Sequence, residues 1–334
     1  MMSVYHMSRA EKKTKVVTIT GGTGGFVLLS GLKEYPIHIS AIVNMADDGG
    51  STGVLRDDLG VLPPGDVRQC LAALARASSE VRELFSYRFN QGELSGHNAG
   101  NLFLSALEKT TGSFSRAVAV AGKILDVYGR VIPVTENDMR LLIELTDGTT
   151  LEGESTLDDD LRVRDIGVRE VTLAHEVTAN KAALDAIDQA DVIVIGPGDI
   201  YGSIIPSLLV KGIPEALRDT SARIIVVANA TNKRGISDGF DAHKYVSIVE
   251  KYLLGREVDI LMCNTQDPST ALSELYEQQE GEGMFVECEE KETPYRVVGG
   301  DFLQETTEAH TRSFIRHDSS KLAKAIIECI DDYE

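Results

Sequence analysis

The sequence predicts an α/β protein with a mostly parallel sheet that is covered by helices on both faces. Short β-branched runs recur along the chain, and most are followed by a segment with helical periodicity. These runs are apolar at nearly every position, which is typical of strands buried on both faces. The composition is that of an ordinary globular protein, with 43% hydrophobic and 25% charged residues among 334. A chain of this length buries a core without disulfides or a structural metal.

The first part of the chain is predicted to contain two strands and five helices. Lys15 to Thr20 is a strand, followed by the glycine turn GGTGG and a helix over FVLLSGLKEY. A second strand, His38 to Val43, leads into the loop ADDGGSTG. Helical patterns then cover Asp66 to Ala77, Ser79 to Asn90, Gly100 to Thr111 and Ser113 to Leu125. Residues 1–14 are polar and basic, and we expect a flexible N-terminal tail before a single domain over residues 15–334.

The middle of the chain has a different pattern, and we expect a small inserted β-rich subdomain from about Gly129 to His175. The segments RVIPVT, LLIELTDGTTLEGES and VREVTLAH suggest short antiparallel strands, with Asp147-Gly148 as a hairpin turn. Strands and helices alternate again afterwards. The expected helices are 180–190, 213–220, 242–254 and 317–331, and the expected strands are 192–195, 224–228 and 260–263.

Charge and composition exclude several classes of partner. The chain has 33 basic and 52 acidic residues, a net charge of -19, which argues against nucleic acid and anionic membranes as partners. No apolar run approaches the ~18 residues of a membrane span, and the N-terminus lacks the apolar region of a secretory signal. We therefore expect a cytoplasmic protein. Its four cysteines are far apart in the sequence and are expected to be buried thiols, not zinc ligands: Cys70, Cys263, Cys288 and Cys329.

Polar residues follow each of five predicted strands, and this pattern predicts a ligand site. The strand ends carry GGTGG, NMADDGGSTG, GPGDIYGS, Asn229-Ala230-Thr231-Asn232 and Asn264-Thr265-Gln266. In an open parallel sheet, ligands bind outside the carboxyl ends of the strands, most often where the strand order reverses. We therefore expect a ligand crevice at this edge of the sheet.

The first two motifs each allow a structural and a functional interpretation. GGTGG lacks the spacing of the dinucleotide fingerprint and the Lys-Ser/Thr of a P-loop, so it can be a packing turn. We favour a phosphate contact, because backbone N–H groups at a helix N-terminus bind anions. Asp47 and Asp48 can be turn formers, or they can accept hydrogen bonds from ligand hydroxyls or bind a magnesium ion.

The later motifs are also ambiguous. Asp66 is expected to be a helix N-cap, with Gln69 three residues on. Arg68, one turn into that helix, is placed to neutralise a phosphate. His97 lies in the glycine-flanked turn SGHNAGNLFL, just before a helix. This position makes ligand binding by His97, Asn98 and Asn101 and a structural role for them equally acceptable interpretations.

These motifs together resemble the CofD-like family and, within it, the YvcK-like gluconeogenesis factors. The resemblance extends from Val16 to about Ala325. Six motifs carry it in the order of the family: GGTGG, ADDGGSTG, PPGDVR, LSGHNAGNL, IGPGDIYGS and RHDSSKLA. The sequence departs from the usual pattern at Thr20, Thr52, Asn98 and Asp199-Ile200. Asp199 could repel an anion if its side chain pointed into the crevice.

The resemblance implies a Rossmann-like, doubly wound fold, a homodimer and a nucleotide-type ligand. One branch of the family transfers a phospholactyl group to a deazaflavin with magnesium, as 2-phospho-L-lactate transferase. The other binds UDP-sugars such as UDP-N-acetylglucosamine and is linked to gluconeogenic growth and cell shape. The pairing of DDGGSTG with PPGD resembles the second branch. No catalytic residue is therefore assigned in this sequence. A nicotinamide-dependent oxidoreductase is a third alternative, disfavoured by the missing fingerprint.

The strand ends and the family motifs together define the candidate site. Asp47 and Asp48 are also the candidate magnesium ligands. The candidate ligand-binding residues are Gly21, Gly22, Thr23, Gly24, Asp47, Asp48, Gly49, Gly50, Ser51, Thr52, Gly65, Asp66, Arg68, His97, Asn98, Asn101, Gly196, Pro197, Gly198, Ser203, Asn229, Asn264 and Arg316.

Overall fold

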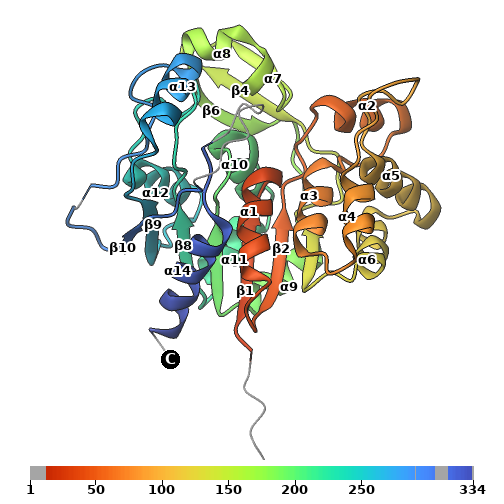
Figure 1. Cartoon of the computed structure of the whole chain (residues 1–334), viewed down its shortest axis with the longest axis horizontal. Helices are drawn as coiled ribbons and strands as arrows, with labels where there is room; N and C mark the ends of the chain where they lie inside the picture. Colours follow the sequence, from red (N-terminus) through yellow and green to blue (C-terminus); the bar gives the residue numbers. More distant parts are fainter. Residues whose placement is uncertain (1–12, 290, 305–314, 333–334) are drawn as a thin grey trace, which may run out of the picture.

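The computed structural model describes residues 13–289, 291–304 and 315–332, and a seven-stranded parallel sheet lies at its centre (Figure 1). Every neighbouring pair of strands in this sheet is parallel. The predicted fold class is therefore confirmed. The strands are β1 (Lys15–Thr20), β2 (His38–Val43), β3 (Arg130–Pro133), β7 (Val192–Ile195), β8 (Arg223–Val227), β9 (Ile260–Asn264) and β10 (Arg296–Gly300).

Helices cover both faces of this sheet. In Figure 1, α1 and α14 lie in front of the strands and α11 lies behind them. The helices are α1 (Gly22–Leu32), α2 (Gly50–Leu59), α3 (Gly65–Leu74), α4 (Ser79–Ser86), α5 (Ala99–Thr111), α6 (Phe114–Ile124), α7 (Thr156–Asp159), α8 (Leu161–Ile166), α9 (Lys181–Asp188), the π-helix η1 (Ile200–Ile204), α10 (Ile205–Leu208), α11 (Ile213–Asp219), α12 (Ala242–Glu250), α13 (Thr270–Glu280) and α14 (Ser319–Asp331).

The strand order reverses between β1 and β7. The order across the sheet is β10-β9-β8-β7-β1-β2-β3, so the chain proceeds in one direction from β1 and in the other from β7. Right-handed crossovers from these two strands place their helices on opposite faces of the sheet. The loops after β1 and β7 therefore diverge and leave a crevice at the carboxyl edge, where a ligand site is expected.

A three-stranded antiparallel sheet forms the inserted subdomain. Its strands are β4 (Leu141–Leu145), β5 (Thr150–Glu152) and β6 (Val168–Leu173), in the order β5-β4-β6. The prediction that RVIPVT is an antiparallel strand of this insertion is wrong. Arg130–Pro133 pairs with β2 in parallel, with Ser40 opposite Arg130, and forms the edge of the main sheet. In Figure 1 the insertion, with α7 and α8, lies over the carboxyl edge of the main sheet.

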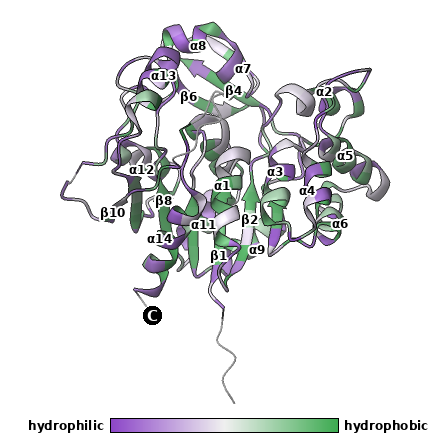
Figure 2. Ribbon diagram, viewed as in Figure 1, coloured by the Kyte–Doolittle hydropathy of each residue, from purple (hydrophilic) through white to green (hydrophobic). Residues whose placement is uncertain are grey.

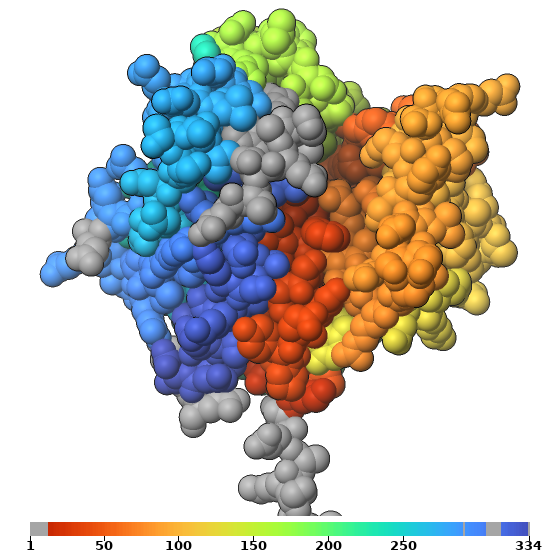
Figure 3. Space-filling model, in the orientation of Figure 1, coloured from red at the N-terminus to blue at the C-terminus, as the bar shows by residue number. Residues whose placement is uncertain are grey.

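The core is built from the central strands and the inner faces of the helices. All four residues of β7 are buried, as are the last five of β1. Figure 2 shows the strands of the main sheet largely in the hydrophobic colour and much of α8 in the hydrophilic one. Figure 3 shows α1, in red, and α14, in blue, side by side on one face of the molecule. In the described part of the chain, no helix has the length and apolarity that crossing a bilayer would need.

Several local predictions differ from the structure. The stretch after Gly49, expected to be a loop, forms α2. Gly22 to Gly25 of GGTGG form the first turn of α1, and only Gly21 precedes the helix. Helix α13 and strand β10 were not predicted. Residues 1–12 of the expected N-terminal tail lie outside the described residues.

The prediction for the cysteines is wrong for one pair. Cys263, in β9, and Cys288, before β10, form a disulfide with their Cα atoms 5.9 Å apart. Cys70 and Cys329 are free and buried, as predicted. A separation of 25 residues along the chain does not reveal that two Cα atoms come within bonding distance, so the spacing could not predict the pair.

Candidate functional site

A pocket of about 290 Å³ lies in the crevice between the ends of β1 and β7. It is therefore at the point where the strand order reverses. Among the predicted residues, those that line it are Gly21, Gly22, Thr23, Gly24, Asp47, Asp66, Pro197, Gly198, Ser203, Asn229 and Arg316. Further lining residues include Glu154, Asp158, Asp199, Lys233 and His317.

The N-terminus of α1 forms one wall of the pocket. Gly21 is the N-cap of α1 and has no side chain that could bond to the helix N-terminus. The first turn of α1 contains no acidic residue. The backbone approaches other chain segments closely here: a Cβ on Gly24 would overlap the carbonyl oxygen of Pro197, and one on Gly21 would overlap Ser203. Glycine is therefore required for packing at these positions. Gly21 to Gly24, at the N-terminus of α1, line the pocket, and a helix N-terminus favours a bound anion.

Asp66 lies at this same helix end and is not an N-cap, which corrects the sequence prediction. The N-cap of α3 is Pro64, and Asp66 lies in the first turn of that helix. Its side chain instead accepts hydrogen bonds from the backbone N–H of Gly22 and from Asn44. Burial, and then the neighbouring charge of Asp47, raise the pKa of Asp66 to about 8. The capping prediction failed because the geometry of the turn before the helix, not residue type, decides which residue is the cap.

Asp47 and Glu154 belong to the same acidic group. Burial, opposed by hydrogen bonds from Gly49 and Thr52, raises the pKa of Asp47. Burial, followed by the charges of Asp47 and Asp66, raises the pKa of Glu154 well above its usual value. These carboxyl groups thus disfavour one another's charge, and each binds a proton more readily than an isolated carboxyl. A positive group placed among them would reverse this effect.

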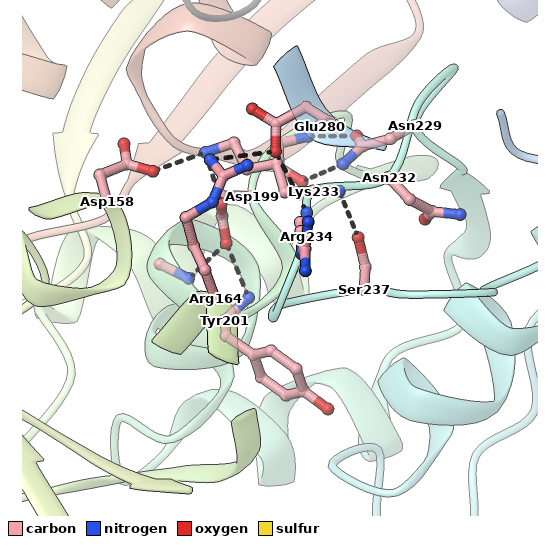
Figure 4. Close-up of polar contacts among 12 residues, drawn as sticks. Asp158, Arg164, Asp199, Tyr201, Asn229, Asn232, Lys233, Arg234, Ser237 and Glu280 are labelled. Carbon is pink, nitrogen blue, oxygen red and sulfur yellow. Dashed lines mark hydrogen bonds and ion pairs between the residues drawn. The ribbon is translucent and has the colours of Figure 1, made fainter. Parts of the chain in front are cut away.

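Lys233, which also lines the pocket, supplies a positive charge. Its Nζ lies 2.8 Å from Asp199 Oδ2 and 3.4 Å from Asp158 Oδ1. Figure 4 shows Lys233 between these two carboxylates. Burial alone would lower the pKa of Lys233, but the charges of Asp199 and Asp158 outweigh burial and raise it. Lys233 therefore stays charged at neutral pH.

Asp199 does not repel a ligand in the way the sequence suggested. Its carboxylate also accepts hydrogen bonds from the N–H groups of Tyr201 and Gly202, and so caps η1. Burial would raise the pKa of Asp199, but the charge of Lys233 outweighs burial and lowers it. The carboxylate is thus neutralised by the lysine and by the N-terminus of η1, and its role is to fix the position of Lys233.

The remaining walls carry amide and basic groups. Asn229 exchanges two hydrogen bonds with the backbone of Gly198, which holds the loop after β7 against the end of β8. Arg316 and His317 enter the pocket from the segment before α14. His317 is 5% exposed, and no described residue bonds to its Nε2. Burial lowers the pKa of His317 to about 4, so its ring is neutral and can donate to or accept from a ligand.

Five predicted residues form a separate polar network between α2, α3 and α5, and they do not line the pocket. Ser51 Oγ lies 3.2 Å from His97 Nδ1 and accepts from the Asn98 N–H and from Asn101 Nδ2, both at 3.3 Å. Asn98 is the N-cap of α5 and accepts from Gly100 and Asn101. Arg68 Nε donates to Asn101 Oδ1 at 3.0 Å. These groups bond to one another and join helices.

Asp48 and the other predicted residues also lie outside the pocket lining. Asp48 Oδ1 accepts from the Ser155 N–H at 2.8 Å, so it attaches the insertion to the main domain. Thr52 bonds to Asp47, and Gly65 packs against both. Asn264 bonds to the backbone of Gln266 and Phe302 at the end of β9. Gly49 and Gly50 begin α2, and Gly196 precedes the pocket residue Pro197.

The sequence interpretation missed Lys233 and Glu154 as site residues. Lys233 follows β8 within ATNKRG, a strand end that had been marked as polar, and a basic residue there was the available signal. Glu154 belongs to the insertion, which no strand-end rule connects to the crevice. His317 lies within RHDSSKLA and gives no separate signal in the sequence.

Asp47 and Asp66 fit a shared magnesium ion better than the predicted pair of Asp47 and Asp48. Both line the pocket, and a cation between them would relieve their mutual repulsion. Among the described residues, no group of three or more His, Cys, Asp or Glu side chains is arranged to hold a metal. Magnesium is commonly bound by one or two carboxylates together with the phosphates of a ligand, which suits this pair.

Comparison with known proteins identifies relatives along nearly the whole chain. The family model described as "2-phospho-L-lactate transferase CofD" matches residues 16–303. A Nostoc protein named "Putative gluconeogenesis factor" is 40% identical over 96% of this chain and 69% of its own. The "Gluconeogenesis factor" of Bacillus subtilis is 34% identical over 96% of this chain and 99% of its own. A crystal structure of a UPF0052-family protein from Bacillus halodurans, 35% identical, superposes with a TM-score of 0.85 over 95% of this chain and 99% of that one.

Proposed function

We propose a function from the premise that the chain belongs to the CofD family and is a relative of the bacterial gluconeogenesis factors. The pocket between β1 and β7 binds a nucleotide sugar of the UDP-N-acetylglucosamine type. The protein acts as a cytoplasmic regulator that links carbon metabolism to cell-wall synthesis and cell shape. The observation that supports ligand binding most directly is that the glycine-rich N-terminus of α1 and the charged Lys233 line the same pocket.

The diphosphate of the ligand fits between these two positive features. A helix N-terminus and a lysine ammonium both stabilise phosphate oxygens. Arg316 adds a third positive group from the segment before α14. The pocket volume of about 290 Å³ is near the lower end of small-molecule sites, so we expect part of the nucleotide sugar to extend beyond it.

The acidic group determines the conditions of binding. A diphosphate beside ionised Asp47, Asp66 and Glu154 would be repelled, so these groups must retain protons or share a cation with the phosphates. The raised pKa values of Asp66 and Glu154 allow the first arrangement near neutral pH. Magnesium would allow the second, and would bind together with the ligand. Affinity for the ligand should therefore fall in EDTA at pH 9 and recover with Mg²⁺.

One alternative has a specific observation in its favour. Paired carboxylates at a phosphate site are the arrangement that magnesium-dependent group transfer uses. Asp47 and Asp66 would then serve a 2-phospho-L-lactate transferase acting on a deazaflavin. Incubation with a guanylyl-activated phospholactate donor, deazaflavin and Mg²⁺ distinguishes the two functions, because only the transferase forms a phospholactyl product.

A matched pair of asparagine variants tests the location of the site. Asn229 and Asn264 both follow strands of the main sheet and both bond to neighbouring backbone, but only Asn229 lines the pocket. UDP-N-acetylglucosamine should raise the thermal midpoint of the native protein, and Asn229→Ala should reduce this shift. Asn264→Ala should retain it. The same measurement is made with a panel of UDP-, GDP- and nicotinamide-containing compounds. If UDP-N-acetylglucosamine leaves the thermal midpoint unchanged, the proposal is wrong.

A further inference from the structure

The disulfide between Cys263 and Cys288 lies at the carboxyl edge of the main sheet, the edge that carries the β1–β7 pocket. Cys263 is the fourth residue of β9 and is 1% exposed, whereas Cys288 is partly exposed. Their Cα atoms are 5.9 Å apart, an ordinary separation for a disulfide. Cys288 ends a stretch, residues 284–288, that we call the strap. The disulfide attaches this strap to a strand of the main sheet.

The strap pairs with the loop that follows β8, the strand next to β9 in the sheet (Figure 1). The Val286 N–H donates to the carbonyl oxygen of Ala230 at 3.2 Å. The Asn232 N–H donates to the carbonyl oxygen of Met284 at 2.7 Å. Ala230 and Lys233, on this same loop, line the pocket. Two backbone hydrogen bonds therefore connect the disulfide-bonded strap to the pocket wall.

Beyond the disulfide and this pairing, the strap has modest support. Val286 packs on the main core, and Glu287 accepts a hydrogen bond from the Ala242 N–H at 2.9 Å. Met284 belongs to a small apolar cluster that is separate from the main core. Residues 281–289, as the structure describes them, form no helix or strand. Segments with few buried contacts open locally at low cost, and a covalent bond at the end of the strap opposes this opening.

We propose that the Cys263–Cys288 disulfide is a redox switch for the pocket. With the bond formed, the strap holds the loop after β8 in place and keeps Lys233 where it lines the pocket. With the bond reduced, the strap separates from β9 more readily, and the pocket is complete in a smaller fraction of the molecules. Ligand affinity falls in proportion to that fraction. The switch rests on the proposed function only for the identity of the ligand.

Reduction requires a dithiol, which supplies two electrons and two protons. One thiolate of the dithiol attacks the sulfur of Cys288, because Cys263 is the buried member of the pair. The bond between the two cysteines breaks, and Cys263 leaves as a thiolate and takes a proton. The second thiol then displaces Cys288 from the mixed disulfide, so the reagent becomes a cyclic disulfide and Cys288 takes the other proton. Exchange with an added disulfide reverses the reaction.

Hydrogen exchange on the full chain tests the switch without a ligand. The oxidised form, prepared with oxidised glutathione, should have two free thiols by alkylation, and dithiothreitol should expose all four. Reduction should speed exchange of the Asn232 and Val286 amides about tenfold or more, because both bond across the strap. Exchange in β4, in the insertion, should stay the same. Equal exchange in both forms, or a pair that cannot be oxidised and reduced in the folded protein, overturns the proposal.

Calorimetry with UDP-N-acetylglucosamine measures the effect on the pocket. The reduced protein should bind about tenfold more weakly than the oxidised protein, the loss expected if the pocket is complete in about one reduced molecule in ten. Equal affinity of the two forms overturns the control of the pocket by the disulfide. If neither form binds the ligand while their exchange rates differ, the proposed function is wrong and the switch is retained.

Two alanine variants separate loss of the bond from loss of a thiol. Cys288→Ala cannot form the bond, so it should bind the ligand like the reduced native protein and should not respond to dithiothreitol. Cys329 is a free, buried thiol on α14, so Cys329→Ala is the matched control and should respond like the native protein. A Cys288→Ala variant that responds to dithiothreitol, or that binds as tightly as the oxidised native protein, overturns the assignment.

Discussion

Two neighbouring polar regions differ in how their polar groups are satisfied. In the network between α2, α3 and α5, Ser51, Asn98 and Asn101 bond to one another and cap a helix. In the β1–β7 pocket, burial and the charge of Asp47 raise the pKa of Asp66, and burial and the charges of Asp47 and Asp66 raise the pKa of Glu154. Ser51, Asn98, Asn101 and Asp66 come from glycine-containing motifs that the sequence analysis had assigned to one ligand site, whereas Glu154 comes from the insertion.

The difference shows which polar motifs bind ligands. A network whose members satisfy one another gains stability and needs nothing from outside. A group of carboxyls that repel one another stores unfavourable energy, which a ligand, a proton or a cation removes. We therefore expect changes in the network to alter folding stability alone, and changes in the pocket to alter both stability and ligand binding.

The largest effect is expected for Lys233→Met in the pocket. The change leaves Asp199 without its cation, and Asp199 is 15% exposed. Removing one partner of a buried ion pair costs about 3 kcal/mol or more, and urea unfolding should show a loss near the lower figure because Lys233 is 25% exposed. The midpoint shift by UDP-N-acetylglucosamine should disappear as well.

A matched lysine provides the control for this variant. Lys181 also bonds to an aspartate, Asp185, at 2.7 Å, but its side chain is 84% exposed. Lys181→Met should cost less than about 1 kcal/mol and should retain the ligand shift. If Lys233→Met were as mild as Lys181→Met, the pocket would not depend on a buried ion pair.

The next effect is a pH dependence that belongs to Asp66. Its pKa in the folded state, about 8, lies above the ordinary value of 3.8. At pH values between these two pKa values, Asp66 is protonated in the folded state and ionised in the unfolded state. The free energy of unfolding therefore falls as pH rises from 4 to 8. One such group contributes up to about 1.4 kcal/mol per pH unit.

Asp66→Asn should remove this contribution and make the ligand-free protein more stable than the native protein at pH 8. Urea unfolding at several pH values measures the slope. Asp58→Asn, an exposed change on α2, should leave the slope as it is in the native protein. A slope unchanged by Asp66→Asn would mean that Asp66 is ionised in the folded protein throughout this range.

The sequence predicted the parallel sheet and the location of the crevice, because apolar runs and the residues that follow them are local features. β1, β2 and β7 were predicted with the bounds that the structure shows. The parallel pairing of β3 was missed, because the segment adjoins an antiparallel insertion and its partner, β2, lies far earlier in the chain. Helix α2 was read as a loop because its first residues, GST, have weak helix propensity.

The ion pair of Lys233 could not be predicted for a related reason. Lys233 is 34 residues from Asp199 and 75 residues from Asp158 along the chain. Each residue alone reads as an ordinary loop charge. Only the fold, which brings the ends of β7 and β8 together and places the insertion over them, turns the three charges into a site.

A smaller effect is expected for Asn98→Ala in the network. Asn98 caps α5 through two backbone N–H groups, and loss of such a cap costs about 1 kcal/mol. The midpoint shift by UDP-N-acetylglucosamine should remain. Asn180→Ala, which removes the cap of α9 away from the pocket, is the control and should have a similar cost. Loss of the ligand shift in Asn98→Ala alone would mean that the network contributes to binding.

The smallest effect is expected for Ser51→Ala, which defines the boundary between the two regions most sharply. Ser51 stands inside ADDGGSTG, four residues after the pocket residue Asp47, yet its hydroxyl contacts only network groups, at 3.2 and 3.3 Å. Hydrogen bonds of this length contribute little, so urea unfolding should show a loss of about 1 kcal/mol or less. Calorimetry should show ligand affinity close to that of the native protein. Weaker binding with unchanged stability would show that the ligand reaches α2, and the pocket would then include the network.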